Sequence, residues 1–319
     1  MPLDRRAERL IAMLAAGGRQ TGETPAARRE ALSALARMAD DASAPARTWQ
    51  VEAGGPNGPI PLRVYEPEGV GAARLPGLVF FHGGGWVAGD FETHDGLCRR
   101  LALAAGCRLI AVDYRLAPEH PFPAAFDDCV AATGWVTEHA AELGIDAARL
   151  AVGGDSVGAG LAAAAASHFR DVGGPRIALL LLICPILDAE ATSRSRAAYG
   201  EGYFLSQAAF QRDLDDYAGP AGARHDPRIS PLNAGDLSGL PAAIVHTAEY
   251  DPFRDEGELY AVRLRDAGVP VRRTRHTGMI HYFYAMARAI PYAHEAGAMI
   301  GAELREAFAA PARAVLETG

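Results

Sequence analysis

The clearest chemical signal in the sequence surrounds Ser156. Residues 154–158 read G-D-S-V-G, between a strand-like apolar run at 150–153 and an alanine-rich, helix-like stretch that begins near Val157. A serine on a sharp strand-to-helix turn exposes its hydroxyl, and the helix N-terminus offers N–H groups and a positive dipole to developing negative charge. The pattern therefore predicts a nucleophilic serine.

Two other interpretations of this turn remain open at this point. A glycine-rich turn can pack a helix closely against a strand without any catalytic role. A dinucleotide site would need G-x-G-x-x-G after the first strand of the fold. Here the stretch 153–160 reads G-G-D-S-V-G-A-G and follows the fourth or fifth predicted strand, which disfavours the dinucleotide site.

A second glycine-rich segment, H-G-G-G-W at residues 82–86, directly follows an apolar run at 78–81. Consecutive glycines let backbone N–H groups converge where the carbonyl oxygen of an acyl-transfer transition state becomes negative. We expect Gly83 and Gly84 to supply two such donors and the N–H of Val157 to supply a third. His82 precedes the loop, and we expect it to fix the shape of the loop by hydrogen bonding.

These motifs need a scaffold, and the hydrophobic pattern predicts one. Short, nearly continuous apolar runs alternate with helix-like stretches, as in a parallel sheet covered by helices on both faces. The predicted strands lie at 77–81, 107–112, 149–153, 177–183 and 242–247, and the predicted helices near 94–105, 122–141, 157–169 and 255–267. Two alternating segments at 48–53 and 60–65 predict a hairpin before this α/β unit.

Two parts of the chain do not fit this alternation. Residues 1–45 read as helical, and residues 188–225 contain aromatic side chains but no clear buried strand. An excursion of that length in an α/β domain is usually functional, often as a lid. Its aromatic residues either seat the excursion on the sheet domain or line a pocket, and the sequence favours neither interpretation.

Composition excludes several classes of function. The net charge of −8 argues against a nucleic-acid partner or an anionic membrane, and the apolar run 177–187 is too short to span a bilayer. All 31 basic residues are arginine, which excludes lysine Schiff bases and the P-loop lysine. The four cysteines show no zinc-ligand spacing, so we expect no metal, reduced thiols and a cytoplasmic location.

Taken together, the motifs resemble those of the hormone-sensitive-lipase group of α/β-hydrolase carboxylesterases. Five blocks stand in the order and spacing of that group: HGGGW at 82–86, DYRLAPEHPFPAAFDD at 113–128, GDSVGAG at 154–160, DPFRDEG at 251–257 and GMIHYF at 278–283. Two positions depart from the group. Val157 stands where alanine is usual, and Tyr282 stands where glycine is common, which puts the size of the substrate in doubt.

The resemblance implies an α/β-hydrolase fold with a mostly parallel, eight-stranded sheet and a helical cap. In that arrangement, residues 1–45 and 188–225 form the cap, and residues 46–187 and 226–319 form the core. It also implies hydrolysis of short- to medium-chain carboxylic esters without a cofactor. A homodimer is compatible with the resemblance, although no residue in the sequence indicates one.

Hydrolases of this type place serine, acid and histidine in that order along the chain. The general base is therefore expected to be a histidine that follows the acid. Three histidines follow the candidate acids: His276, His281 and His294. His281 lies in a predicted loop after the strand 269–275 and within the GMIHYF block, so we assign it as the base. His276 falls at the end of that strand and His294 in the last helix.

The acid follows the strand 243–247. We assign Asp251, which would accept a hydrogen bond from His281 and fix the tautomer that deprotonates the serine. Glu249 is the alternative acid. Asp255 and Glu256 open the next predicted helix, where capping explains them.

The expected partner is a small-molecule ester. The candidate pocket residues are Trp86, Asp155, Tyr203, Phe204 and Tyr282. Three rival functions stay open: a ligand-binding receptor on the same fold, an amidase or long-chain lipase that uses the same triad, and a dinucleotide-dependent oxidoreductase. The presence of His281 favours an enzyme over a receptor.

Overall fold

A single sheet brings the predicted motifs to one edge. The structure is a computed structural model that describes residues 1–16, 24–70, 74–219 and 223–309, and in that part of the chain the sheet has eight strands. The strands are β1 (Ala46–Gly55), β2 (Gly58–Pro67), β3 (Leu75–Phe81), β4 (Arg108–Val112), β5 (Ile145–Asp155), β6 (Leu179–Ile183), β7 (Ala242–Tyr250) and β8 (Val271–Ile280). Their order across the sheet is β1-β2-β4-β3-β5-β6-β7-β8.

The pairing of the strands follows the hydrophobic pattern. Strands β3 to β8 pair in parallel, and every residue of β4 and of β6 is buried, as their continuous apolar sequences predict. Strands β1 and β2 form the predicted antiparallel hairpin, in which Gly55 pairs with Gly58. The mostly parallel, eight-stranded sheet of the prediction is therefore confirmed.

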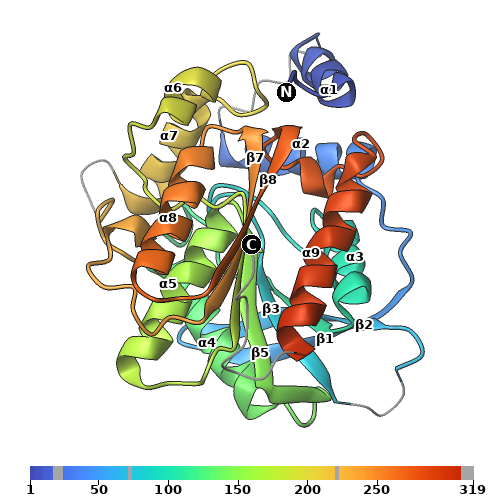
Figure 1. Ribbon diagram of the computed structural model, residues 1–319, viewed down its shortest axis with the longest axis vertical. Coiled ribbons are helices and arrows are strands. Elements are labelled where there is room, and N and C mark those ends of the chain that lie inside the picture. The colour runs from blue at the N-terminus through green and yellow to red at the C-terminus, as the bar shows by residue number, and fades with distance from the viewer. Residues whose placement is uncertain (17–23, 71–73, 220–222, 310–319) are drawn as a thin grey trace.

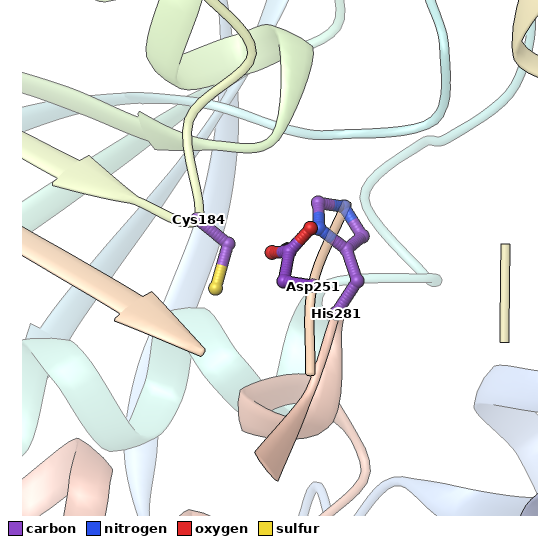
Figure 2. A group of neighbouring side chains, drawn as sticks. All are labelled: Cys184, Asp251 and His281. Carbon is purple, nitrogen blue, oxygen red and sulfur yellow. Dashed lines mark hydrogen bonds and ion pairs between the residues drawn. The ribbon is translucent and has the colours of Figure 1, made fainter. Parts of the chain in front are cut away.

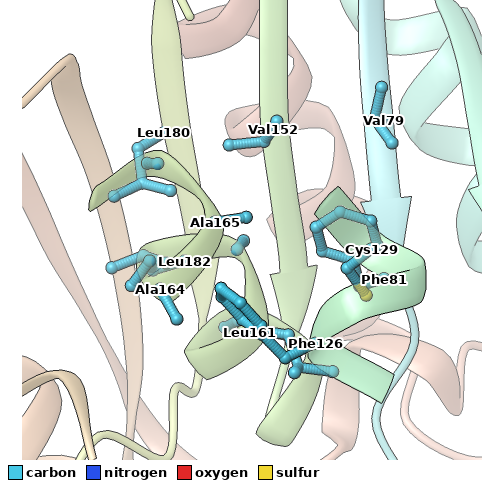
Figure 3. Packing of buried hydrophobic residues seen from close by; sticks show 14 of the residues in the cluster. Val79, Phe81, Phe126, Cys129, Val152, Leu161, Ala164, Ala165, Leu180 and Leu182 are labelled. Carbon is cyan, nitrogen blue, oxygen red and sulfur yellow. The ribbon is translucent and has the colours of Figure 1, made fainter. Parts of the chain in front are cut away.

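Helices cover both faces of this sheet (Figure 1). Helices α3 (Asp95–Ala105) and α9 (Tyr292–Ala309) pack side by side on one face, and α4 (Ala124–Glu138), α5 (Val157–Val172) and α8 (Arg254–Asp266) cover the other. Figure 3 shows part of the core on the second face. Strand side chains such as Val152 and Leu182 meet the small residues Ala164 and Ala165 of α5, which let the helix approach the sheet closely.

The remaining α-helices of the described residues lie beyond the carboxyl ends of the parallel strands (Figure 1). They are α1 (Arg5–Ala16), α2 (Pro25–Ala39), α6 (Arg194–Tyr199) and α7 (Gln207–Ala218), so they come from the two segments predicted as a cap. Thr24, Ser193 and Ser206 accept the expected hydrogen bonds at the N-termini of α2, α6 and α7. We refer to these four helices as the cover.

Two glycines of α9 provide a matched test of the packing between α3 and α9. A Cβ on Gly301 would lie 2.2 Å from the Cβ of Ala104, whereas a Cβ on Gly297 would meet nothing within 4 Å. We expect Gly301→Ala to lower the free energy of unfolding by about 1–3 kcal/mol through overpacking. Gly297→Ala should raise it by about 0.5–1 kcal/mol, because alanine loses less backbone entropy in a helix. Denaturant unfolding of both variants checks this, and equal effects of the same sign would contradict the packing described.

Candidate active site

Ser156 occupies a strained turn between β5 and α5. Its backbone angles, φ 55° and ψ −124°, are rare for a residue with a side chain. Neighbouring backbone leaves room only for glycine on either side: a Cβ on Gly154 would lie 2.4 Å from the carbonyl oxygen of Phe81, and one on Gly158 would lie 2.0 Å from the same atom. The G-x-S-x-G pattern is thus required by the close approach of the turn to β3.

Backbone hydrogen bonds hold the turn in this conformation. The Ser156 N–H donates to the carbonyl oxygen of Ile183 at 2.9 Å, and the Ser156 carbonyl accepts from the N–H of Ile186 at 3.1 Å. Both partners belong to the end of β6 and the segment after it. Because two hydrogen bonds fix the residue from the neighbouring strand, the energetic cost of its positive φ is offset.

Three side chains from the ends of β5, β7 and β8 form one hydrogen-bonded chain. The Nε2 atom of His281 lies 3.0 Å from the Oγ of Ser156, and its Nδ1 lies 2.7 Å from the Oδ2 of Asp251. Asp251 also accepts a 2.8 Å hydrogen bond from the N–H of Phe253 through Oδ1. All three side chains are buried. A neutral imidazole in this position donates to the carboxylate and accepts from the hydroxyl.

The alternative acid and bases lie elsewhere. Glu249 accepts a 2.7 Å hydrogen bond from the N–H of Gly278 and does not contact His281. His276 stacks against His246, with Nε2 2.9 Å from Nδ1 of that ring, and burial together with His246 lowers the pKa of His276 to about 3. The imidazole of His294 is half exposed and nearest to a different carboxylate.

The prediction that Asp255 and Glu256 cap α8 is contradicted. The Asp255 carboxylate accepts a 2.9 Å hydrogen bond from the N–H of Ser195, and that of Glu256 accepts one of 2.9 Å from Leu187. Glu256 also forms a buried ion pair with Arg196 at 2.6 Å. Both acids therefore secure the segment that leads into α6.

The glycine loop presents its donors differently from the prediction. The Gly83 N–H donates to the Oδ1 of Asp155 at 3.0 Å, so it is already engaged and the prediction that it faces the substrate is contradicted. Gly84 and the next residue, Gly85, line the cavity beside Ser156. Their N–H groups, like that of Val157 at the start of α5, donate to no group in the described part of the chain.

His82 supports the loop as predicted from its position. Its Nδ1 donates to the carbonyl oxygen of Gly83 at 2.8 Å, and its ring stacks on Tyr114 with a centroid distance of 4.3 Å. Burial and the neighbouring His94 lower the pKa of His82 to about 4, so the ring stays neutral. A neutral, stacked ring is suited to holding a loop and does not reach Ser156.

A cavity of about 420 Å³ opens above Ser156 and His281, between the sheet edge and the cover. Of the five predicted pocket residues, Phe204 and Tyr282 line it, and their rings stack 6.0 Å apart. The other three do not. Trp86 is buried against Tyr217, Asp155 faces away beneath the glycine loop, and Tyr203 packs against Tyr199 and Tyr250.

The sequence prediction missed the contribution of the N-terminal helices to this cavity. Apolar side chains of α1 and α2 form a large part of its wall: Ile11, Leu14, Leu32 and Leu35. Other apolar lining residues come from α7, from the connection between α6 and α7, and from the segments after β6 and β7: Phe210, Leu205, Ile186 and Phe253. The resemblance placed residues 1–45 in the cap, but helical periodicity does not indicate which side chains of an apolar helix face line a cavity.

One buried ion pair joins the two halves of the cover at the wall of the cavity. Arg28 of α2 binds the Oδ1 atom of Asp213 on α7, and both side chains are mostly buried. The other carboxylate oxygen of Asp213, Oδ2, packs against Gly85, and a Cβ added to Gly85 would lie 2.2 Å from it. Burial raises the pKa of Asp213 to about 7, although Arg28 opposes the rise.

Among the described residues, one group of three potential ligand side chains has the spacing of a metal site: Cys184, Asp251 and His281 (Figure 2). The facing atoms of Asp251 and His281 are already hydrogen-bonded. Burial, followed by the neighbouring Asp251, raises the pKa of the Cys184 thiol well above its usual value and disfavours the thiolate that a metal requires. The arrangement therefore fits a hydrogen-bonded chain better than a ligand set.

The described helices include none that is both long and apolar enough to cross a membrane.

Both the sequence and the fold match proteins of known class. Residues 78–285 match the family described as the alpha/beta hydrolase fold. The chain is 47% identical over 231 residues to the carboxylic ester hydrolase LipN of Mycobacterium tuberculosis, covering 68% of this chain and 59% of LipN. It is 42% identical over 244 residues to the esterase LipI of the same organism, covering 76% of each chain.

A solved structure agrees over nearly the whole length. The ester-hydrolase EH1AB1 from the metagenome of Lake Arreo, complexed with a bipyridine phosphonate derivative, superposes with a TM-score of 0.92 at 40% identity. The match covers 97% of this chain and 100% of that one. The chain therefore belongs to the α/β-hydrolase fold family. Within that family, the predicted resemblance to the hormone-sensitive-lipase group of carboxylesterases is confirmed by these relatives.

The Arg28–Asp213 pair gives a testable prediction about the cover. Arg28→Met leaves a buried carboxylate without its partner and should lower the free energy of unfolding by about 3 kcal/mol. The double variant Arg28→Met/Asp213→Asn should recover most of the loss, because no uncompensated charge remains. Thermal unfolding of the two variants and of Asp213→Asn completes the cycle. A double variant no more stable than Arg28→Met would contradict this account.

Proposed function

We propose that this protein hydrolyses carboxylic esters through an acyl-enzyme intermediate on Ser156. The observation that carries the proposal is the hydrogen-bonded chain from Asp251 through His281 to Ser156 on the floor of the cavity. The serine supplies the nucleophile, the imidazole the base, and the carboxylate orients the imidazole. The esterase names of the relatives support the same reaction.

The first half of the reaction follows from this chain. The Ser156 oxygen attacks the ester carbonyl carbon while its proton passes to the Nε2 of His281, and the carbonyl electron pair moves onto oxygen. When the carbonyl re-forms, the C–O bond to the alcohol breaks, and the imidazolium returns the proton to that leaving oxygen. Water then repeats the sequence on the acyl-enzyme, with His281 as base, and releases the acid and the free serine.

The negative oxygen needs donors that are free to face it. We assign this role to the N–H groups of Gly84, Gly85 and Val157, in place of the sequence-based set that included Gly83. Gly84 and Gly85 line the cavity beside Ser156, and the Val157 N–H stands at the N-terminus of α5. Each such donor contributes roughly 2.7–4 kcal/mol to the transition state in comparable sites.

The substrate class follows from the cavity. Its volume of about 420 Å³ lies within the range of sites that hold a small organic molecule, and most of its wall is apolar. We infer that short- to medium-chain esters bind with the acyl or alcohol chain against the cover. In this proposal the segments 1–45 and 188–225 act as the cap of a core formed by 46–187 and 226–319.

The rival functions differ in what they require. A receptor on this fold needs the cavity but not the alignment of His281 with Ser156, so the 3.0 Å contact favours an enzyme. An amidase or a long-chain lipase would use the same chain of residues and differs only in substrate.

A cytoplasmic location and a homodimer stay predictions, and the four free, buried cysteines are compatible with the cytoplasmic location.

The nucleophile is tested by a series of p-nitrophenyl esters of increasing acyl length. We expect turnover to be highest for short acyl chains and to fall by roughly 10⁶-fold in Ser156→Ala, since removal of the nucleophile leaves little beyond oxyanion stabilisation. An organophosphonate should label the wild type stoichiometrically and leave Ser156→Ala unlabelled. Comparable turnover in the variant would falsify the assignment.

The acid is tested by comparing two neighbouring carboxylates. Asp251→Asn should lower kcat by about 10⁴-fold, because the amide favours the wrong tautomer of His281. Glu249→Gln removes a carboxylate of similar location that contacts Gly278 instead, so its kcat should stay close to that of the wild type. Steady-state kinetics on both variants decide between them, and the reverse ranking would make Glu249 the acid.

A further inference from the structure

A group of buried polar side chains lies behind the glycine loop, outside the cavity. At its centre is Asp155, which is completely buried. Its carboxylate accepts hydrogen bonds from the Gly83 N–H at 3.0 Å and from the Tyr284 hydroxyl at 3.1 Å. The Nε2 atom of His94 lies 3.3 Å from Oδ1 and 3.4 Å from Oδ2 of the same carboxylate. None of these groups takes part in the proton transfers proposed above.

The hydrogen-bond partners of His94 determine its protonation. Its Nδ1 lies 2.9 Å from the Oγ1 of Thr93, and the same Oγ1 lies 2.9 Å from the carbonyl oxygen of Asp90. When the hydroxyl donates its single hydrogen to that carbonyl oxygen, it accepts from Nδ1–H. On the other side of the ring, the Asp155 carboxylate only accepts. In this arrangement both ring nitrogens donate, which makes His94 an imidazolium that forms a buried ion pair with Asp155.

The surrounding charges agree with this state. Burial opposes a charge on the ring, yet Asp155, followed by Asp90 and Asp40, raises the pKa of His94 above its ordinary value. Burial likewise opposes the carboxylate, yet His94 lowers the pKa of Asp155. The titratable and charged groups that face or neighbour this pair come from several elements: Asp40, His82, Asp90, Asp95, Cys98, Arg100, Tyr282 and Tyr284.

The same network reaches every segment that carries a reacting group. Asp155 precedes Ser156 in the chain, and its partner Gly83 precedes the two proposed oxyanion donors. Tyr284 follows His281 by three residues, and the hydroxyl of Tyr282 donates to the carbonyl oxygen of Thr93 at 2.9 Å. The loop is also confined sterically, since a Cβ on Gly83 would lie 2.4 Å from Asp155 Oδ2.

We propose that the His94–Asp155 ion pair positions the oxyanion donors, with Asp155 holding Gly83 so that the next two peptide N–H groups face the cavity. The inference rests on the proposed function, because it assigns a role within the same reaction. Both residues are positioning residues, since neither touches the substrate cavity. The imidazolium keeps the carboxylate ionised and in place.

The pair predicts a pH dependence whose sign is fixed. Because the pKa of His94 is raised on folding, the contribution of the pair is complete at pH values below the unfolded pKa of histidine and is lost as pH rises through the folded value. Because the pKa of Asp155 is lowered, its contribution is lost only as pH falls through that lower value. We therefore expect kcat of the wild type to decline on the alkaline side as His94 loses its proton.

His94→Gln tests the charge while keeping a donor to Asp155, and His294→Gln is the control at a half-exposed histidine. We expect His94→Gln to lower kcat by about 10²-fold, as displaced catalytic groups do, with little change in KM and no alkaline decline. Phosphonate inactivation should slow in parallel, and His294→Gln should match the wild type. In the wild type, ¹⁵N NMR should show both ring nitrogens of His94 protonated near pH 7.

The outcomes separate this inference from the proposed function. A wild type that neither turns over esters nor reacts with the phosphonate removes the proposed function. If the wild type is active and labelled but His94→Gln has the same kcat and pH profile, only the positioning role is wrong. A neutral His94 ring in the wild-type NMR spectrum also overturns it, and that measurement does not depend on whether the variant folds.

Discussion

The close contact between the β5–α5 turn and strand β3 is the constraint on which the site depends. Gly154 and Gly158 lie so near the carbonyl oxygen of Phe81 that any Cβ there would overlap backbone. Only this approach lets Ser156 adopt its positive φ while α5 still packs on the sheet. Because parallel strands end at the same edge, the segments after β7 and β8 then deliver Asp251 and His281 to the same point.

The carboxylates of the site are costly to bury, and the hydrogen bonds that each accepts offset this cost. Asp251 accepts from both a backbone N–H and His281, and Asp155 accepts from Gly83, Tyr284 and His94. An isolated buried carboxylate would take up a proton, whereas His94 and the other donors around Asp155 lower the pKa of that carboxylate despite its burial. Each of the two carboxylates near the proposed nucleophile therefore has its own set of hydrogen-bond donors.

The sequence predicted the features that depend on local pattern. Periodicity predicted the strands, glycine spacing predicted the turn at Ser156, and motif order predicted the positions of Asp251 and His281. Ser156, Asp251 and His281 each follow the end of a strand. The cavity wall could not be predicted in this way. Which face of α1 or α2 meets the sheet edge depends on packing between distant segments, so Leu32 and Arg28 carry no local signal. Trp86 and Tyr203 illustrate the same limit, because residue type alone does not indicate whether an aromatic ring lines a cavity or packs against other rings.

The error at Gly83 has a more specific physical cause. A run of three glycines indicates that backbone N–H groups are exposed to something, but it does not indicate which peptide faces which side. In an extended or looped backbone, successive N–H groups point in different directions, so one glycine can anchor the loop while the next two serve a ligand. Here the anchor is Asp155, the residue just before Ser156. The G-D-S sequence thereby joins the proposed nucleophile and the support of its oxyanion donors in adjacent positions, so neither can move without the other.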